Sequence, residues 1–296
     1  MLSIAGSDSG GGAGIQADLK AFAACGVHGM TAITAITAQN TVVVTAVEPV
    51  PAAMIQAQVR AVAQDIGVDA VKIGMLGDAA TIAVVAAALD ELPSGTPVVL
   101  DPVMVAESGA TLLAAHARRA LVAELLPRAS VITPNVPEAL ALLDAGGAGG
   151  PSAGDAAGGP SVAGAAGGPS AADAAGGEPD VPGLARQLAS LGPRAVLITG
   201  GHRPQAIDVL WDGERILEIP GETHPGGAAH GSGCTHSSVL AARLAWGDEL
   251  PQAARTAKAL ASGAVRDGLR ELGAGAGPDN VLGSLIGGSV GAGPLT

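Results

Sequence analysis

The segment Gly231-Ser232-Gly233-Cys234 has the residue types of an anion-binding loop. Two glycines allow a tight turn and let bare backbone N–H groups approach a ligand closely. The helical spacing that follows, 234–246, places these groups at the positive end of a helix dipole, where phosphate binds. Cys234 stands in the same turn, a position that stabilises a thiolate and makes it a candidate base. Taken alone, the segment fits an ordinary helix start about equally well, because glycine-rich loops are common.

Three predicted buried strands also end in residues suited to a site: Asp101 follows one, Asn135 with Glu138 follows the next, and Gly200-Gly201 follows the third. The carboxyl ends of parallel strands share one edge of a sheet, so we expect these residues to converge there. Asp101 and Glu138 are candidates for holding Mg²⁺, which prefers a few carboxylates together with phosphate oxygens. Singly, Asp101 also fits a turn before proline, and Glu138 the first turn of a helix. Together with the loop above, they favour a phosphoryl-transfer site.

These residues require an alternation of strands and helices to bring them together, and the hydrophobic pattern supplies one. The expected strands are 2–5, 29–38, 42–47, 70–73, 98–100, 131–133, 195–199, 206–211 and 216–219. The expected helices are 15–24, 52–64, 79–89, one within 111–126, 136–143, 181–191, 234–246 and 251–272. Asp212-Gly213 is typical of a hairpin turn between the last two strands. The pattern predicts a mostly parallel sheet covered by helices.

The N-terminal loop Gly6–Gly14 follows a strand and precedes a helix, as a dinucleotide-binding loop would. Its glycines do not form the G-x-G-x-x-G spacing, however. Gln39-Asn40-Thr41 stands where an acidic residue for the ribose is expected. We therefore do not predict dinucleotide binding.

Residues 149–175 contain three copies of a nine-residue unit that begins Gly-Gly-Pro-Ser. The unit has almost no large apolar side chain to bury, so it cannot offset the entropy of ordering. We expect 145–180 to be a disordered low-complexity insertion, explained by repeat expansion without a function. The segments 1–144 and 181–272 then form a single domain, and 273–296 is a glycine-rich tail that we expect to be frayed.

Composition excludes several classes of protein. The net charge is −12, and no basic cluster is visible, which argues against a nucleic-acid surface. No apolar run is long enough to span a membrane, and no secretory signal is recognisable. The two cysteines are too few for a disulfide framework, so we expect a cytoplasmic protein. The chain begins almost inside its first predicted strand, and we expect the true start to lie upstream.

The chain resembles the hydroxymethylpyrimidine/phosphomethylpyrimidine kinases of thiamine biosynthesis, in the ribokinase-like superfamily. Seven segments carry the resemblance, in family order and over nearly all of the chain outside 145–180. They are Ala5-Gly6-Ser7-Asp8-Ser9-Gly10-Gly11-Gly12-Ala13-Gly14-Ile15-Gln16-Ala17-Asp18-Leu19-Lys20, Thr37-Ala38-Gln39-Asn40-Thr41, Lys72-Ile73-Gly74-Met75-Leu76, Leu100-Asp101-Pro102-Val103-Met104, Thr133-Pro134-Asn135-Val136-Pro137-Glu138-Ala139, Gly200-Gly201-His202 and His230-Gly231-Ser232-Gly233-Cys234-Thr235. The first and the last are highly specific together.

The resemblance implies a three-layer α/β/α ribokinase-like fold with a mostly parallel central sheet. It implies transfer of phosphate from ATP to 4-amino-5-hydroxymethyl-2-methylpyrimidine, and then to the resulting monophosphate. The residues implied around the pyrimidine are Asp18, Gln39, Met75 and Val103. Those implied near ATP are Asn135, Glu138, Thr199 and Gly201, with Mg²⁺ near Asp101 and Glu138. The implied anion hole is Gly231, Ser232 and Gly233, with Cys234 as the base that takes the hydroxyl proton.

Two departures from the family pattern affect these expectations. Thr199 stands where the family often has lysine, so one phosphate contact is missing, and Ser232 replaces the usual threonine. A pyridoxal or pyridoxine kinase of the same superfamily is the alternative enzyme, although the context of Gln39 favours the pyrimidine. A non-catalytic binding protein that kept the fold is a third class, and Thr199 is the one change that suggests it. The resemblance also implies a homodimer.

Overall fold

The computed structural model describes residues 1–107, 109–147, 179–201, 203 and 205–283. Its strands are β1 (Leu2–Ala5), β2 (Met30–Ile33), β3 (Ala35–Gln39), β4 (Val44–Pro49), β5 (Val71–Ile73), β6 (Val98–Leu100), β7 (Val131–Ile132), β8 (Val196–Ile198), β9 (Asp208–Trp211) and β10 (Ile216–Ile219). Its helices are α1 (Gly14–Ala24), α2 (Ala52–Asp65), α3 (Ala79–Leu89), α4 (Ala115–Ala120), α5 (Val136–Gly146), α6 (Val181–Ala189), α7 (Ser232–Ala245) and α8 (Leu250–Arg266). A π-helical turn and a 3₁₀ turn continue α4 to Arg128.

Within these residues, eight strands form the main sheet in the order β10-β9-β8-β7-β6-β5-β1-β2. The run from β2 to β8 is parallel throughout. The strands β9 and β10 add an antiparallel hairpin at one edge. The expected mostly parallel sheet is confirmed, and the carboxyl ends of β1, β5, β6, β7 and β8 lie along one edge of it.

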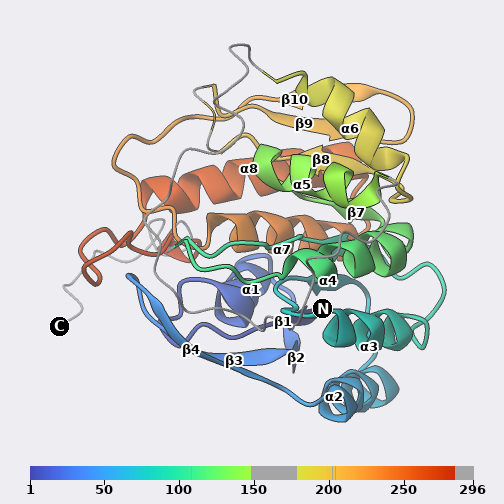
Figure 1. The fold of residues 1–296 in the computed structure, drawn as a ribbon. Helices are drawn as coiled ribbons and strands as arrows, with labels where there is room; N and C mark the ends of the chain where they lie inside the picture. The colour runs from blue at the N-terminus through green and yellow to red at the C-terminus, as the bar shows by residue number, and fades with distance from the viewer. Residues whose placement is uncertain (108, 148–178, 202, 204, 284–296) are drawn as a thin grey trace.

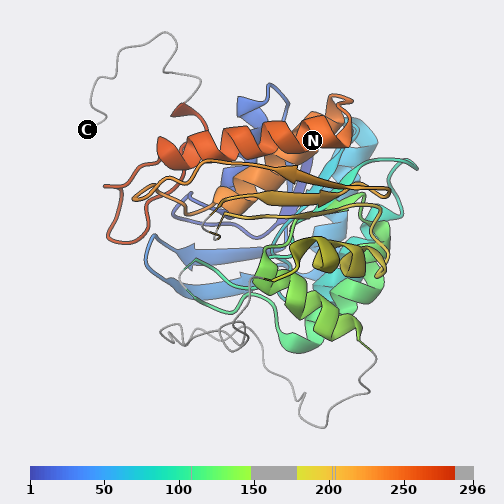
Figure 2. The same ribbon diagram turned by 90° about the horizontal axis from the view of Figure 1, so that it is seen from above.

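Helices cover both faces of this sheet, which gives three layers (Figures 1 and 2). Helices α1, α7 and α8 pack together on one face, and α2 to α6 pack in series on the other. Alternate side chains of the central strands point to opposite faces. In β6, Val98 and Leu100 join the core beneath α2 to α6, whereas Val99 joins the core beneath α1, α7 and α8. The α/β/α fold expected from the resemblance is therefore confirmed.

The expected single strand 29–38 is wrong, because the chain breaks at Thr34. Strand β2 lies in the main sheet, but β3 leaves it and pairs with β4 as a separate antiparallel ribbon. The Thr34 hydroxyl donates to the carbonyl of Met75 at 2.8 Å, and its N–H bonds to Ala5. These two bonds hold the polar Thr34 at the bend, where the chain passes from one sheet to the other.

The end of the chain also differs from the prediction. Helix α8 stops at Arg266 instead of continuing to residue 272. The expectation of a frayed tail is wrong for 273–283, because Asp279 and Val281 are buried and Asn280 N–H bonds to Ala264. Gly268 permits the turn, since a Cβ there would lie 2.6 Å from that of Ala228. Residues 273–283 therefore return to the body of the protein, and 284–296 lie outside the described residues.

The predicted insertion, 145–180, falls almost entirely outside the described residues, although α5 reaches Gly146.

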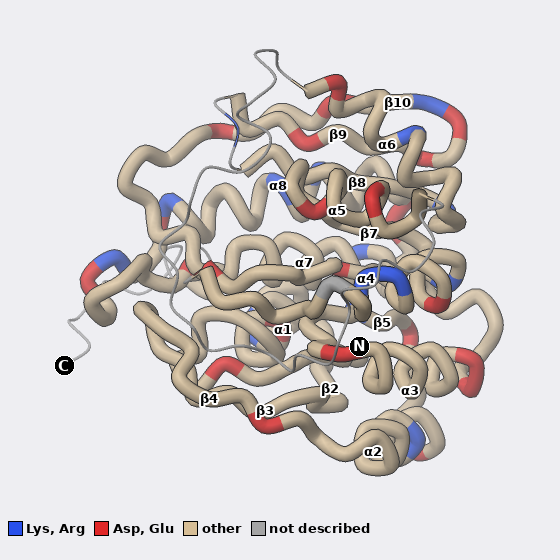
Figure 3. The backbone as a smooth tube through the Cα atoms, in the orientation of Figure 1, with Lys and Arg blue, Asp and Glu red and all other residues tan. Residues whose placement is uncertain are grey.

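Figure 3 shows the Lys and Arg positions spread over separate elements of the fold. None of the described helices is both long enough and apolar enough to cross a membrane.

Candidate active site

A cavity of about 740 Å³ opens at the carboxyl edge of the main sheet. It brings together nearly all of the residues that the sequence singled out. The expected residues that line it are Gln39, Met75, Asp101, Val103, Asn135, Glu138, Thr199, Gly201, Gly231, Ser232, Gly233 and Cys234. The exception is Asp18, which does not line the cavity and has no exposed surface.

The anion loop, which we define as Gly231–Cys234, forms the N-terminus of α7 as predicted. Gly231 caps the helix in the left-handed region, with φ +87°. A Cβ on this residue would overlap the carbonyl oxygen of Gly12, so the loop packs backbone against backbone on the N-terminal glycine loop. Glycine is required at this position both for its φ and for the close approach. The anion loop lines the cavity, where a helix N-terminus can bind an anion, although the Ser232 N–H already donates to the Ala229 carbonyl at 3.0 Å.

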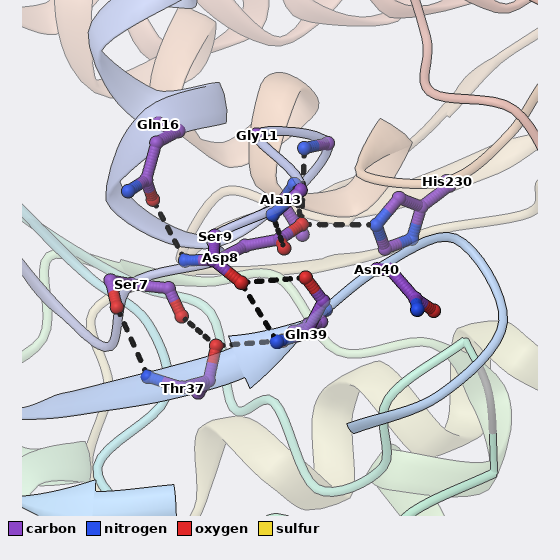
Figure 4. A network of polar contacts seen from close by, with 12 residues as sticks. Ser7, Asp8, Ser9, Gly11, Ala13, Gln16, Thr37, Gln39, Asn40 and His230 are labelled. Atoms are coloured by element: carbon purple, nitrogen blue, oxygen red, sulfur yellow. Dashed lines mark hydrogen bonds and ion pairs between the residues drawn. The ribbon is translucent and has the colours of Figure 1, made fainter. Parts of the chain in front are cut away.

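The glycine loop 6–14, by contrast, already holds an anion of its own (Figure 4). The Asp8 carboxylate accepts from the backbone N–H groups of Gly10, Gly12 and Ala13 at 2.8 to 3.0 Å. It also contacts His230 Nε2 at 3.1 Å. Although burial alone would raise the pKa of Asp8, the His230 contact and these N–H groups hold it below its usual value. The N–H groups of this loop thus bind a carboxylate of the protein itself.

Asp18 lies beneath the cavity and is fully buried, so it has no exposed surface to offer the pyrimidine ring that the resemblance implies. Its Oδ1 is 2.8 Å from Lys72 Nζ, and both side chains are fully buried. The hydroxyls of Ser3 and Ser238 also donate to it, at 2.5 and 2.7 Å. Lys72 itself lines the cavity. Although burial would lower the pKa of Lys72, the charges of Asp18, Cys234 and Asp101 raise it, so the ammonium form persists.

The surroundings of Cys234 shift the pKa of its thiol in opposite directions. Burial raises the pKa of Cys234 to about 12, despite the lowering effect of the Lys72 charge. The charges of Asp18 and Asp101 raise it further, and the backbone N–H of Gly14 lowers it. These surroundings favour the thiol of Cys234 over the thiolate that the helix N-terminus was expected to stabilise. Lys72 and Gly14, which favour the thiolate, were not part of that expectation.

Asp101 and Glu138 form the acidic side of the cavity. Ser237 Oγ on α7 donates to Asp101 Oδ2 at 2.9 Å. Asn135 and Glu138 form a capping box at the start of α5, in which each side chain accepts from the other residue's N–H at 2.9 Å. Burial raises the pKa of Asp101. Burial, followed by the charge of Asp101, raises the pKa of Glu138 to about 8. A cation between them would relieve both effects.

The pyrimidine side of the cavity contains three of the four expected residues: Gln39, Met75 and Val103. Met75 is buried in a small cluster with Ala35 and Leu112, and Val103 packs against it. Gln39 ends β3, and its backbone N–H bonds to Ser9 Oγ at 2.8 Å. These residues supply an apolar wall beside an amide that can both donate and accept, which suits an aminopyrimidine.

The sequence analysis did not predict the cluster of Asp208, Lys258 and His236, which lies near Thr199. Asp208 Oδ1 accepts from Lys258 Nζ at 2.6 Å and from the N–H of Gly200 at 2.8 Å. Its Oδ2 contacts His236 Nε2 at 3.0 Å, and all three side chains line the cavity. Burial would raise the pKa of Asp208, but the His236 contact and the Lys258 charge hold it below its usual value. The cavity thus has a cation beside the turn that follows Thr199.

The chain is similar to known kinases in sequence and in fold. The family model of phosphomethylpyrimidine kinase matches residues 8–153 and 172–280. The hydroxymethylpyrimidine/phosphomethylpyrimidine kinase of Rhizobium meliloti (strain 1021) is 44% identical over 280 residues, which cover 94% of each chain. Among solved structures, an ADP complex of Bacillus subtilis pyridoxal kinase aligns with a TM-score of 0.77 at 34% identity, covering 96% of this chain and 98% of that one. Phosphomethylpyrimidine kinase from Clostridium difficile 630 aligns with a TM-score of 0.67 at 37% identity, covering 87% and 95%.

The family model spans most of the chain, and the curated and solved relatives extend over nearly all of it. The relatives are kinases, and the cavity holds the anion loop and the two carboxylates that the resemblance placed at a phosphoryl-transfer site. By sequence and by fold, the chain belongs to the phosphomethylpyrimidine kinase family of ribokinase-like enzymes.

Proposed function

We propose that the protein transfers the γ-phosphoryl group of ATP to 4-amino-5-hydroxymethyl-2-methylpyrimidine, and then a second one to the monophosphate. One observation carries the proposal: the anion loop with Cys234, the Asp101–Glu138 pair and the wall of Gln39 and Met75 share a single cavity. Its size is in the range of small-molecule sites. The adenine nucleotide would lie on the side of Thr199 and Lys258, and the pyrimidine on the side of Gln39.

In the proposed reaction, the substrate hydroxyl oxygen forms a bond to the γ-phosphorus while the bond from this phosphorus to the ADP oxygen breaks. The hydroxyl proton passes to Cys234 Sγ as thiolate, and ADP leaves with the electron pair. Of the expected anion hole, the N–H groups of Gly231 and Gly233 would hold the charge on the transferring phosphoryl oxygens, because the Ser232 N–H donates to the Ala229 carbonyl. Lys72 and the N–H of Gly14 are the groups that would stabilise the thiolate against burial.

We propose Asp101 and Glu138 as the residues that hold Mg²⁺, directly or through water. Two carboxylates fit this ion, because magnesium needs only a few protein carboxylates beside phosphate oxygens. A larger set of protein ligands is not found: the described residues contain no group of three or more His, Cys, Asp or Glu that could hold a metal. Bound there, Mg²⁺ would neutralise negative charge on the ATP phosphates. The proposal is supported by the charge of Asp101, which together with burial raises the pKa of Glu138, because a cation between the two carboxyl groups would offset their mutual repulsion.

The test is a coupled assay of ADP release with the pyrimidine alcohol, its monophosphate and pyridoxal as separate acceptors. We expect the highest kcat/KM for the pyrimidine alcohol and its monophosphate, and none without Mg²⁺. Pyridoxal is the second candidate because the fold matches a pyridoxal kinase at a TM-score of 0.77. A clear preference for pyridoxal would reverse the assignment. Pyrimidine binding without turnover in calorimetry would instead indicate the non-catalytic class.

We also propose a homodimer and a cytoplasmic location. Exposed apolar side chains on β3 and in the loop after it support the dimer: Ile36 is 56% exposed and Val42 is 52% exposed. Light scattering coupled to gel filtration tests this, and a monomer mass would contradict it. The two free thiols, Cys25 and Cys234, suit a reducing compartment.

A further inference from the structure

Asp8 and His230 connect two loops of the cavity that are far apart in the sequence. His230 Nε2 lies 3.1 Å from Asp8 Oδ2, and both side chains are buried, at 6% and 1% exposure (Figure 4). Asp8 belongs to the glycine loop 6–14, whereas His230 directly precedes the anion loop. The reaction proposed above uses neither side chain.

Asp8 is poorly suited to bind a ligand itself. Its Oδ1 accepts from Gly10 N–H at 2.8 Å, and its Oδ2 accepts from Gly12 and Ala13 N–H at 3.0 and 2.8 Å. His230 contacts Oδ2 as well. A carboxylate with these acceptor positions filled would repel a phosphate instead of binding it. Asp8 therefore acts through the groups that it holds.

The backbone of His230 is held by hydrogen bonds, in addition to the contact between its ring and Asp8. Its N–H bonds to the carbonyl of Gly277 at 3.3 Å, and its carbonyl accepts from Asp279 N–H at 3.0 Å. The next residue is Gly231, the left-handed cap of α7. His230 is therefore held at its ring and at its backbone immediately before the residue at which the anion loop begins.

The glycine loop is attached equally firmly to the pyrimidine side (Figure 4). Thr37 Oγ1 donates to the Ser7 carbonyl at 2.8 Å. Ser9 Oγ donates to the Gln39 carbonyl at 2.6 Å and accepts from its N–H at 2.8 Å. Ser7 and Ser9 flank Asp8 on either side. One chain of contacts thus runs from Gln39 through the glycine loop and Asp8 to His230 and the anion loop.

We propose that Asp8 and His230 are positioning residues that set the anion loop relative to the pyrimidine side of the cavity. This inference rests on the proposed function, because it assigns the contact to aligning the γ-phosphate with the acceptor hydroxyl. Transfer between two bound groups is sensitive to displacement, and an error of 1 Å costs about 100-fold in rate. Holding both loops to one carboxylate provides that alignment without touching the reacting atoms.

The experiment compares His230→Leu, His230→Gln, Asp8→Asn and the double variant Asp8→Asn/His230→Leu with the unaltered protein. His230→Leu breaks the connection but leaves the three backbone contacts of Asp8 in place. His230→Gln retains an N–H donor for Asp8. As a matched control we use Asp212→Asn, because Asp212 also accepts from two backbone N–H groups, at 3.0 and 2.9 Å, in a hairpin turn outside the cavity.

We expect His230→Leu to lower kcat about 10- to 100-fold, with the KM for the pyrimidine alcohol unchanged. His230→Gln should recover part of the loss. Asp8→Asn should lower kcat and also raise the KM for the alcohol, because it frees the glycine loop. In the double variant, loss of His230 should add nothing further to the loss of kcat, since residues that act as one unit are not additive.

Additive losses of kcat in the double variant would overturn the proposal. So would a His230→Leu protein whose KM for the alcohol rises while kcat is unchanged. Near-ultraviolet circular dichroism of each variant shows whether it has folded, and His230→Gln serves if His230→Leu does not fold. The unaltered protein separates the two hypotheses: if it has no kinase activity, the proposed function fails, whereas normal variants of an active enzyme refute only the positioning role.

Discussion

Lys72 Nζ lies 2.8 Å from Asp18 Oδ1, and neither side chain has any contact with solvent. The pair crosses from β5 to α1 beneath the anion loop. Removing one partner of a buried ion pair leaves an uncompensated charge, which costs about 3–5 kcal/mol. We expect Lys72→Met to lower the free energy of unfolding by that amount in urea denaturation, and Lys72→Met/Asp18→Asn to recover much of it.

The matched control for this pair is Arg60→Met. Arg60 and Glu91 also form a short ion pair, at 2.6 Å, but on the exposed surface. Exposed pairs contribute below about 1 kcal/mol, so this variant should unfold close to the unaltered protein. Equal losses for Arg60→Met and Lys72→Met would contradict the argument from burial.

The kinetics of Cys234→Ala test the assignment of the base. A positioned general base contributes about 10²- to 10⁴-fold to the rate, and we expect kcat to fall within that range while KM for ATP changes little. Cys25→Ala is the control, because Cys25 is a free thiol outside the cavity. Full activity in Cys234→Ala would remove Cys234 from the mechanism without affecting the assignment as a kinase.

Alkylation of Cys234 reports on its pKa directly. Burial raises this pKa to about 12, so the thiol stays protonated at neutral pH and the reactive thiolate is rare. In a Cys25→Ala background, we expect the iodoacetamide rate to rise about tenfold for each pH unit between pH 7 and pH 10. A plateau below pH 8 would show instead that the thiolate is stabilised in the free protein.

Asp279 makes stability depend on pH. Burial raises its pKa to about 6 in the folded protein, above its usual value of 3.8. The folded state then favours the protonated acid, so the contribution to stability is present below about pH 4 and is lost as the pH rises through about 6. At pH 8 we expect Asp279→Asn to be more stable by about 3 kcal/mol, with little difference at pH 4.

Urea denaturation at the two pH values measures this difference. Asp65→Asn is the control, because Asp65 is exposed at the end of α2 and should give the same stability change at both pH values. If Asp279→Asn were destabilised at pH 8, the ionised carboxylate would have to be a favourable contact, contrary to its burial.

Gly231→Ala probes the contact between the two loops. A Cβ at this position would overlap the Gly12 carbonyl, and φ is +87°. We expect kcat/KM to fall about 100-fold, because the loops must separate. Gly26→Ala is the matched control: its φ is +70°, but nothing lies within 4 Å of the new Cβ. It should cost about 1 kcal/mol in stability and leave the kinetics unchanged.

The strands of the sheet could be predicted because their signal is local. Val98–Leu100 and Val131–Ile132 are short apolar β-branched runs, and each is followed by a polar residue that lines the cavity. Long-range contacts have no such signal. Asp8 and His230 are separated by 222 positions, and the tail around Asp279 is glycine-rich with nothing in its own sequence to predict that it packs.

Asp18 is an intermediate case, because its burial could have been inferred. Ile15, Asp18 and Phe22 lie on one face of α1, since residues three and four apart are neighbours on a helix. An acidic residue on an apolar face requires a buried partner, and the sequence has only three lysines to offer one. Lys258 on α8 gives the same signal, because it falls between Ala257 and Ala261 on the buried face.

The return of the tail to His230 has a consequence for the order in which the protein is completed during synthesis. The last strand of the main sheet, β10, ends at Ile219, before the anion loop has been made. The backbone bonds that fix His230 come from Gly277 and Asp279, which follow the whole of α8. Of the residues that hold the phosphate loop, Gly277 and Asp279 are therefore the last to be made, after every strand of the main sheet and after α7 and α8, which cover one of its faces. A chain that ended before Gly277 would contain all strands of the sheet and α8, but it would lack both backbone partners of His230.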